Sequence, residues 1–418
     1  MCFLFSSTEK TSTKPLKTLY QLISIMNLRE EALKLHRINK GKLAVKSKVA
    51  VKTKDDLSLV YTPGVAEVCK EIAANKSLVY DYTMKSNSVA VVTDGSAVLG
   101  LGNIGAEASL PVMEGKCILF KELANIDAFP ICLKTQDEKE IINIVKNIAP
   151  AFGGINLEDI SAPRCFTIEN ELLNIGIPVM HDDQHGSAIV VLAALINAAK
   201  VVKKNIEDLK VVINGAGAAG MATAKLLTCL GIDKKICTSV KELVLCDSKG
   251  IIYDDRPDLN EFKKQMAKVT NKAKRKGTVK DALHEADVFI GLSRANLLTS
   301  NDLKPMNKNA IVFAMANPTP EISFEEASKV AKVVGTGRSD YPNQINNSLA
   351  FPGLFRGALD AKATKINNEM KVAAAHAIAN CIKPTKDRVL PYTLDKFVVP
   401  KVAEAVRKAA IETDVVRK

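Results

Sequence analysis

Residues 181–185 read HDDQH, a short run that offers ligands for two kinds of metal. His181 and His185 stand four apart, the spacing that lets two imidazoles on one helix face hold zinc. Asp182 and Asp183 between them offer carboxylates to a hard cation instead. A zinc pair of this kind normally has a glutamate beside the first histidine and a third ligand, and the sequence shows neither. The pattern therefore favours packing or hydrogen-bonding roles for the two histidines.

Carboxylates also gather upstream, in INLEDISAP, where Glu158 and Asp159 follow an apolar run and precede a proline turn. Carboxylates without interleaved arginine suit Mg²⁺ or Mn²⁺, because these hard cations prefer oxygen ligands. The competing interpretation is that Glu158 and Asp159 form a solvated loop and that Asp182 is a helix N-cap. Spacing alone leaves both interpretations open.

The pattern GxGxxG occurs twice, over residues 100–105 and 215–220. The glycines of the second copy are Gly215, Gly217 and Gly220. This copy stands between an apolar strand and a proline-free helix, and the next strand ends on Asp247, which is the context that dinucleotide binding requires. In the first copy Pro111 follows closely and leaves little room for a helix, so we expect a tight turn there.

The elements that must position these residues differ between the two parts of the chain. Beyond residue 208, apolar strands alternate with helical segments; the strands are LKVVING, KELVLCD, ADVFIGLS and NAIVFAMANP. This rhythm indicates a parallel sheet covered on both faces. The fold class is therefore α/β, with a Rossmann-type doubly wound parallel sheet and a smaller N-terminal α/β substrate domain. We expect a disordered extension over residues 1–26, the N-terminal domain over 27–160, and the Rossmann domain with C-terminal helices over 161–418.

Composition narrows the classes of protein. The chain has 418 residues, 47% hydrophobic and 25% charged, and we find no apolar run long enough to cross a bilayer. The net charge of +12 is spread through helices without an aromatic-plus-basic RNA signature, so we expect an anionic small substrate and neither nucleic acid nor membrane as a partner. The nine cysteines never form CxxC and indicate reduced thiols in the cytoplasm.

Motifs along nearly the whole chain resemble, in order, those of malic enzymes in their short, bacterial-type form. They are YTPGVAEVC, VVTDGSAVLGLGNIG, EGKCILF, LEDISAPRCF, MHDDQHGSA, GAGAAG, ANPTPE and NQINNSLAFPG. The resemblance implies divalent-metal-dependent oxidative decarboxylation of (S)-malate to pyruvate and carbon dioxide. It implies NADP or NAD and Mg²⁺ or Mn²⁺ as cofactors, and a homodimer or higher homo-oligomer.

The resemblance also assigns roles to single residues. Glu158, Asp159 and Asp183 match the ligands of the divalent metal, and Asn317 and Asn347 match the amides that hold malate. Lys116 matches the general base, Asp182 its neighbour and Tyr61 the general acid. A lysine acts as a base near neutral pH only if its pKa falls, which we expect burial and the cation to cause. One departure is that Ser96 and Ala97 stand where larger members carry an arginine that pairs with a malate carboxylate.

The cofactor preference depends on the loop that begins at Asp247. An acid at this position usually binds the ribose hydroxyls and favours NAD, whereas Lys249 beside it would bind a 2′-phosphate. The charge of the loop favours NADP. Two rival functions remain: a metal-independent 2-hydroxy-acid or amino-acid dehydrogenase, and a nucleotide-sensing protein that keeps only the Rossmann half.

Overall fold

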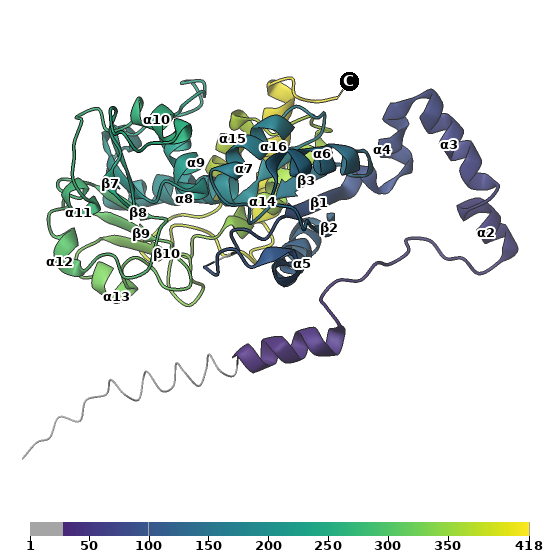
Figure 1. The fold of residues 1–418 in the computed structure, drawn as a ribbon, viewed down its shortest axis with the longest axis horizontal. Coiled ribbons are helices and arrows are strands. Elements are labelled where there is room, and N and C mark those ends of the chain that lie inside the picture. The colour runs from purple at the N-terminus through teal and green to yellow at the C-terminus, as the bar shows by residue number, and fades with distance from the viewer. Residues whose placement is uncertain (1–27, 99, 418) are drawn as a thin grey trace, which may run out of the picture. The chain divides into compact units, whose positions relative to one another are not determined.

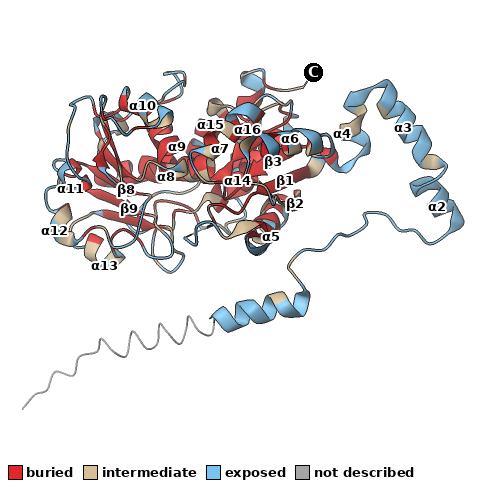
Figure 2. Cartoon of the chain, viewed as in Figure 1, coloured by how far each residue is buried: buried red, intermediate tan, exposed pale blue. Residues whose placement is uncertain are grey.

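The computed structural model describes residues 28–98 and 100–417, and the predicted extension over residues 1–26 lies outside the described residues. The chain divides into two units, residues 1–46 and residues 47–418. The described part of the first unit contains a helix over residues 28–39 that is almost entirely exposed (Figure 2). The rest of this section concerns the second unit.

The first sheet has four parallel strands in the order β2-β1-β3-β4 (Figure 1). Its strands are β1 (Ser88–Thr93), β2 (Asp127–Cys132), β3 (Gly154–Leu157) and β4 (Val179–His181). Every residue of β1 is buried, as expected of a central strand with both faces covered. The register pairs Leu157 with His181, so the residues that follow these two strands leave the sheet side by side.

Because β4 belongs to this sheet, the boundary that we predicted after residue 160 falls inside the first sheet. The helices of this region are α5 (Gly105–Ala124), α6 (Glu138–Ile148) and α7 (Arg164–Leu172). The change to the second sheet comes with α8 (Asp182–Val202), which starts where β4 ends. The sequence did not place this boundary correctly, because β3 and β4 are short and show no clear alternation of polar and apolar residues.

Helix α5 contradicts the expectation that Pro111 leaves little room for a helix. The helix runs for 20 residues through Pro111. A proline inside a helix removes one backbone hydrogen bond and costs about 3 kcal/mol. The buried side chains of Met113, Cys117 and Phe120 offset this cost by packing into the core. The same helix carries Lys116 at a buried position.

The second sheet has six strands in the order β10-β9-β8-β5-β6-β7, and only β7 is antiparallel. Its strands are β5 (Lys210–Asn214), β6 (Glu242–Asp247), β7 (Gly250–Ile251), β8 (Val288–Gly291), β9 (Ile311–Ala314) and β10 (Val333–Thr336). Helices α9 (Ala218–Leu227) and α10 (Glu261–Ala267) lie between strands in the sequence. The predicted α/β class with a Rossmann-type sheet is confirmed.

Helix α8 is the central helix of the second unit and contacts α9 and the C-terminal helix α15 (Asn368–Ala379). By length and composition α8 could cross a membrane, contrary to our expectation that no run is long enough, but 78% of its most apolar window is buried inside the protein. This burial is that of a core helix. The other C-terminal helices are α14 (Phe351–Asp360) and α16 (Val398–Glu412). Phe351 of α14 packs on Phe120 of α5, so the C-terminal helices also contact the first region.

The remaining α-helices are short or exposed. They are α2 (Lys54–Val60), α3 (Gly64–Ala74), α4 (Val79–Tyr82), α11 (Val279–Ala282), α12 (Ser300–Leu303) and α13 (Phe324–Ala327). Helices α2 and α3 contain no buried residue, and Figure 2 shows them almost entirely in pale blue.

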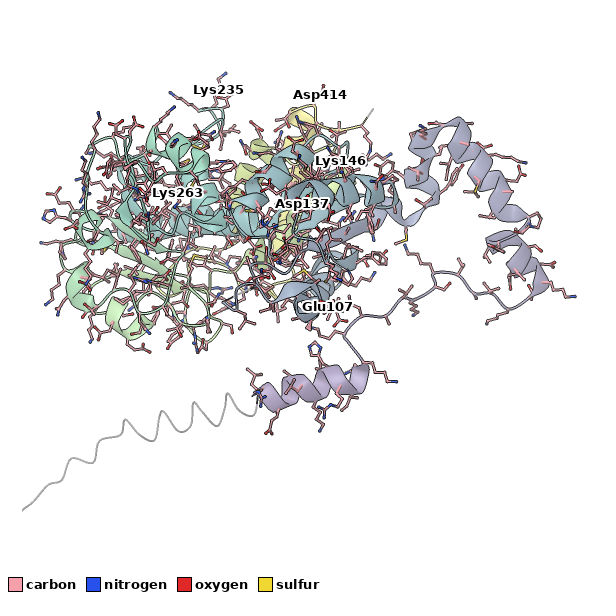
Figure 3. The ribbon with its side chains drawn as sticks, in the orientation of Figure 1. Glu107, Asp137, Lys146, Lys235, Lys263 and Asp414 are labelled. Carbon is pink, nitrogen blue, oxygen red and sulfur yellow. A yellow bond between two sulfur atoms is a disulfide. The ribbon has the colours of Figure 1, made fainter. Side chains whose placement is uncertain are left out.

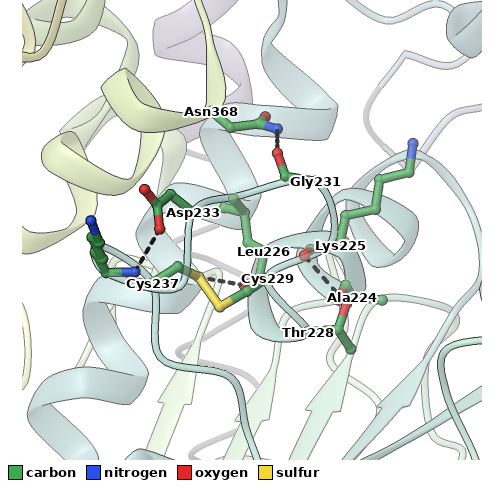
Figure 4. Close-up of a disulfide and its surroundings, with 10 residues drawn as sticks. Ala224, Lys225, Leu226, Thr228, Cys229, Gly231, Asp233, Cys237 and Asn368 are labelled. Carbon is green, nitrogen blue, oxygen red and sulfur yellow. Dashed lines mark hydrogen bonds between the residues drawn. A yellow bond between two sulfur atoms is a disulfide. The ribbon is translucent and has the colours of Figure 1, made fainter. Parts of the chain in front are cut away.

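One pair of cysteines corrects the prediction that all thiols are reduced. Cys229 and Cys237 form a disulfide across a loop between α9 and β6 (Figure 4). The two residues are eight apart in sequence, and the chain turns back so that their Cα atoms lie 5.9 Å apart. The absence of CxxC does not exclude such a pair, because a longer loop brings cysteines together equally well. Six other described cysteines are free thiols.

Candidate active site

Three carboxylates converge where β3 and β4 end. One oxygen from each of Glu158, Asp159 and Asp183 lies within 4.8 Å of the others. Glu158 and Asp159 are both 3% exposed, so they are not the solvated loop of the competing interpretation. The backbone N–H of Asp159 donates to Asp183 Oδ2 at 2.8 Å. Burial, together with the charge of Asp183, raises the pKa of Glu158, although the ammonium of Lys116 works to lower it.

These three carboxylates fit a hard divalent cation. Asp159 also has a left-handed backbone, with φ 53°, at the end of the buried strand. A non-glycine residue in that region costs free energy, and such residues concentrate at functional sites. Carboxylate oxygens gathered in a buried place repel one another unless a cation joins them.

Lys116 lies beside this cluster. Its Nζ is 2.9 Å from Glu158 Oε1 and 2.6 Å from Asp182 Oδ2, and its side chain is 8% exposed. Burial alone would lower the pKa of Lys116, but the charges of Asp182 and Glu158 outweigh burial and raise that pKa. The predicted fall of this pKa is therefore wrong for the chain alone, since two carboxylates stabilise the ammonium form.

Asn347 joins the same group from the C-terminal region. Its Nδ2 donates to Asp182 Oδ2 at 2.6 Å. Asp182 is the first residue of α8, and His181 is its N-cap, so Asp182 is not the cap that the competing interpretation required. A Cβ on Gly186, one turn along α8, would lie 1.8 Å from Asp182 Oδ1. The glycine therefore leaves room for the Asp182 carboxylate.

The two histidines of HDDQH do not form a pair. His185 Nε2 lies 2.9 Å from Glu169 Oε2. His181 is fully buried, and its Nδ1 lies 3.8 Å from Asp183 Oδ2. Glu169 of α7 also accepts hydrogen bonds from the His181 backbone N–H at 2.8 Å and from Gln184 Nε2 at 3.0 Å. The sequence analysis missed Glu169, which fixes the first turn of α8 and with it Asp182 and Asp183.

The second glycine motif has the predicted strand–turn–helix geometry. Gly215 has φ 123°, and a Cβ there would lie 2.2 Å from Leu292 O. A Cβ on Gly220 would lie 1.7 Å from Gly215 O, so only glycine lets the helix approach the strand. Gly217 is the N-cap of α9, and a Cβ on it would meet open space. The N-terminus of α9 is thus accessible to a pyrophosphate.

Asp247, at the end of β6, is surrounded by cations. Both of its oxygens accept hydrogen bonds from Arg256, and Lys263 Nζ donates to Oδ2 at 2.7 Å. Figure 3 labels Lys263, which lies on α10 and which the sequence analysis missed. Burial works to raise the pKa of Asp247, but these hydrogen bonds outweigh it and hold that pKa at about 2. Lys249 donates its backbone N–H to Asp247, whereas its Nζ pairs with Asp258 at 3.0 Å.

Two predicted site residues show no contact with the Lys116 group. Tyr61 follows α2 and is 68% exposed. Asn317 follows β9 and is also exposed; its amide lies close to Gly337. The structure therefore brings together Lys116, Glu158, Asp182 and Asn347, but leaves Tyr61 on the surface.

Comparison with known proteins gives the family. The model of the malic enzyme NAD binding domain matches residues 184–411, and that of the malic enzyme N-terminal domain matches 39–143 and 134–173. The chain is 57% identical over 398 residues to the bifunctional malic/malolactic enzyme of Bacillus subtilis, covering 94% of this chain and 95% of that protein. It is 52% identical to the NAD-dependent malic enzyme of Geobacillus stearothermophilus, covering 95% and 82%.

A solved structure agrees with these matches. The malic enzyme of Pyrococcus horikoshii superposes with a TM-score of 0.88 at 47% identity, covering 94% of this chain and 92% of that one. The model of the N-terminal domain ends at residue 173 and that of the NAD binding domain begins at residue 184, on either side of β4. The chain belongs to the malic enzyme family, in its short form.

Proposed function

We propose that the protein oxidises (S)-malate and decarboxylates the product to pyruvate, with reduction of a nicotinamide cofactor. The observation that carries this proposal is the contact of Lys116 with Glu158 and Asp182, beside the carboxylates of Asp159 and Asp183. A proton-transferring group and a metal site in one buried place are what oxidation followed by decarboxylation requires. The rival metal-independent dehydrogenase needs no such cluster, and the comparisons do not favour it.

Glu158, Asp159 and Asp183 would hold Mg²⁺ or Mn²⁺. A bound cation supplies Lewis-acid chemistry there, polarising the 2-oxygen of the substrate and stabilising negative charge as carbon dioxide leaves. Lys116 would take the proton of the 2-hydroxyl, and its Nζ is held by Asp182, whose carboxylate also accepts a hydrogen bond from Asn347. Because Glu158 and Asp182 favour the ammonium form of Lys116, proton acceptance depends on charge compensation of these carboxylates in the loaded site.

The charges around Asp247 support NADP as the preferred cofactor. Asp247 already accepts hydrogen bonds from Arg256 and Lys263, so its charge is compensated and its oxygens are occupied. The 2′-phosphate of NADP would therefore be repelled less by this paired Asp247 than by an unpaired aspartate. The relatives include enzymes named NAD-dependent and NADP-dependent, so family membership leaves the choice open.

The exposure of α2 and Tyr61 supports a homo-oligomer. Leu57, Leu59 and Tyr61 are 52%, 75% and 68% exposed, and a second copy of the chain would cover them. In such an oligomer Tyr61 would reach the active site of the second copy, where it could protonate enolpyruvate. Replacing Leu59 by Asp should then reduce both the mass of the particle in light scattering and the turnover of malate. A monomeric wild type with full turnover would contradict this proposal.

The six free thiols among the described cysteines support a cytoplasmic protein, because reduced thiols persist in that compartment, whereas the disulfide between Cys229 and Cys237 does not add to this support. The function itself is tested by incubating the protein with malate, NADP or NAD and Mg²⁺, with and without a chelator. Pyruvate and carbon dioxide should form in step with reduced cofactor, and the chelator should stop the reaction. Accumulation of oxaloacetate, or full rates in the chelator, would contradict the proposal.

A further inference from the structure

The guanidinium of Arg164 lies against the turn that follows β1. Arg164 is the first residue of α7, and its Nη2 is 2.8 Å from Asp94 Oδ2 and 2.8 Å from Ser96 Oγ. The same nitrogen donates to Ser161 Oγ at 3.1 Å. Nη1 donates to the carbonyl of Gln136 in a short contact. Arg164 therefore joins the turn at Asp94 to the segment after the metal carboxylates.

The loop that Arg164 holds contacts the backbones of two residues assigned to the site, Asp159 and Asn317. The backbone N–H of Ala97 donates to Asp159 O at 2.9 Å. Further along, a Cβ on Gly100 would lie 2.3 Å from Asn317 O, so the two backbones are in close contact. One end of the loop thus touches the backbone of Asp159, a residue of the metal cluster, and the other touches the backbone of Asn317. This placement makes the loop a wall of the space where malate would bind.

Malate places a specific demand on that space. An α-hydroxy acid reaches a metal through its hydroxyl and the adjacent carboxylate, which leaves the second carboxylate of malate for a protein cation. Lys116 is unavailable, because its Nζ is held by Glu158 and Asp182. Arginine suits the task, since its planar guanidinium matches the geometry of a carboxylate.

Two arginines adjoin the wall, and their existing contacts distinguish them. Arg338 is next to the Asn317 side and donates to Pro318 O at 3.1 Å. The edge of the Arg338 guanidinium formed by Nε and Nη2 already donates to both carboxylate oxygens of Asp340, at 2.8 Å and 2.6 Å. Arg164 meets one oxygen of Asp94 through Nη2 alone, and its Nε donates to no acceptor among the described residues. Arg164 therefore keeps a donor for a ligand, while fully buried Asp94 fixes its orientation.

We propose that Arg164 binds the carboxylate of malate that the metal does not hold, and so selects dicarboxylates over monocarboxylates. This inference rests on the proposed function. Larger members of the family carry the carboxylate-binding arginine at the position of Ser96 and Ala97. Here Arg164, on α7, would supply that positive charge instead. Ser96 helps to hold the guanidinium of Arg164 in place, since Ser96 Oγ accepts hydrogen bonds from both Arg164 and the Ser161 backbone N–H.

The test compares malate with lactate, which keeps the metal-chelating end but lacks the second carboxylate. Equilibrium binding of each acid to the full-length protein with Mg²⁺ and reduced cofactor is measured by calorimetry, alongside KM and kcat for malate. Arg164→Gln should weaken malate binding and raise its KM about 10- to 100-fold, the range for one charge-assisted hydrogen bond. Lactate binding should change less than about threefold. Arg164→Lys should recover part of the malate affinity.

Two comparison variants complete the experiment. Arg407→Gln removes a surface guanidinium on α16 that pairs with Glu404, and it should leave both acids unaffected. Equal weakening of malate and lactate by Arg164→Gln would overturn the proposal, because it would show general damage to the site. Loss of dicarboxylate selectivity in Arg338→Gln but not in Arg164→Gln would also overturn it. If the wild type does not oxidise malate, the proposed function fails instead.

Discussion

Lys116 Nζ and Asp182 Oδ2 lie 2.6 Å apart although 66 residues separate them in the sequence. One comes from the middle of α5 and the other from the first residue of α8. Asp182 Oδ2 also accepts a hydrogen bond from Asn347 Nδ2, so the carboxylate that holds Lys116 is itself held.

Lys116→Ala should lower kcat for malate oxidation by about 10²- to 10⁴-fold, the usual contribution of a general base. Mn²⁺ binding should persist, because Glu158, Asp159 and Asp183 remain. Stopped-flow measurement of reduced cofactor separates this step from binding. A variant with a normal rate of cofactor reduction would show that Lys116 is not the base.

Gly186→Ala should impair turnover without unfolding the protein. The added methyl group would overlap Asp182 Oδ1 and displace that carboxylate from Lys116. Alanine favours the helix by about 1 kcal/mol over glycine, so the melting temperature should not fall in proportion to the activity. Calorimetry and steady-state kinetics on the same preparation check this. Unchanged kcat would mean that Asp182 has another position available.

Lys263→Ala should raise KM for NADP by about 10-fold and change KM for NAD little, because it removes a charge-assisted hydrogen bond near the expected 2′-phosphate. Lys264 is the matched control: it lies next along α10 and pairs with Glu261 on the surface. Lys264→Ala should leave both constants alone. Similar small effects of the two variants would show that Lys263 serves Asp247 only.

Acid stability should depend on Glu169. Burial works to raise the pKa of Glu169, but His185 and Lys371 outweigh it and lower that pKa from 4.5 to about 2. A depressed pKa stabilises the fold above the unfolded value, and this contribution is lost as the pH falls from 4.5 toward 2. By linkage the contribution is roughly 3 kcal/mol.

Glu169→Gln should therefore lower stability at neutral pH and flatten the fall in unfolding free energy below pH 4.5. Glu171→Gln is the control, since Glu171 is exposed on the same helix. Urea unfolding across this pH range measures both. If the unfolding free energies of the wild type and Glu169→Gln fall with the same slope below pH 4.5, Glu169 does not contribute to acid stability.

The sequence supported the sheet of the nucleotide-binding region because its strands are apolar throughout and separated by helices. It did not predict α5, since a proline is normally a helix breaker and tertiary packing decides its cost. It also did not place β4 in the first sheet, because a strand of three residues has no readable period.

At the site, the residue types alone left a carboxylate cluster and a solvated loop equally open, and the family resemblance selected Glu158, Asp159 and Asp183. The register of β3 and β4 explains why these residues lie together. The contacts of Glu169, Arg164 and Lys263 were not predictable, because each depends on a partner distant in the sequence. Tyr61 shows the opposite limit: its motif is clear, yet the structure of this chain leaves it exposed.

The most direct test of the account is a titration of Mn²⁺ by electron paramagnetic resonance in metal-stripped wild type, Asp183→Asn and His185→Gln, with malate turnover measured on the same samples. Asp183→Asn should lose the tight Mn²⁺ site and malate oxidation together. His185→Gln, whose ring lies against Glu169, should keep the Mn²⁺ site and most of the turnover. Tight zinc that His185→Gln abolishes, or full malate oxidation in Asp183→Asn, would contradict the account.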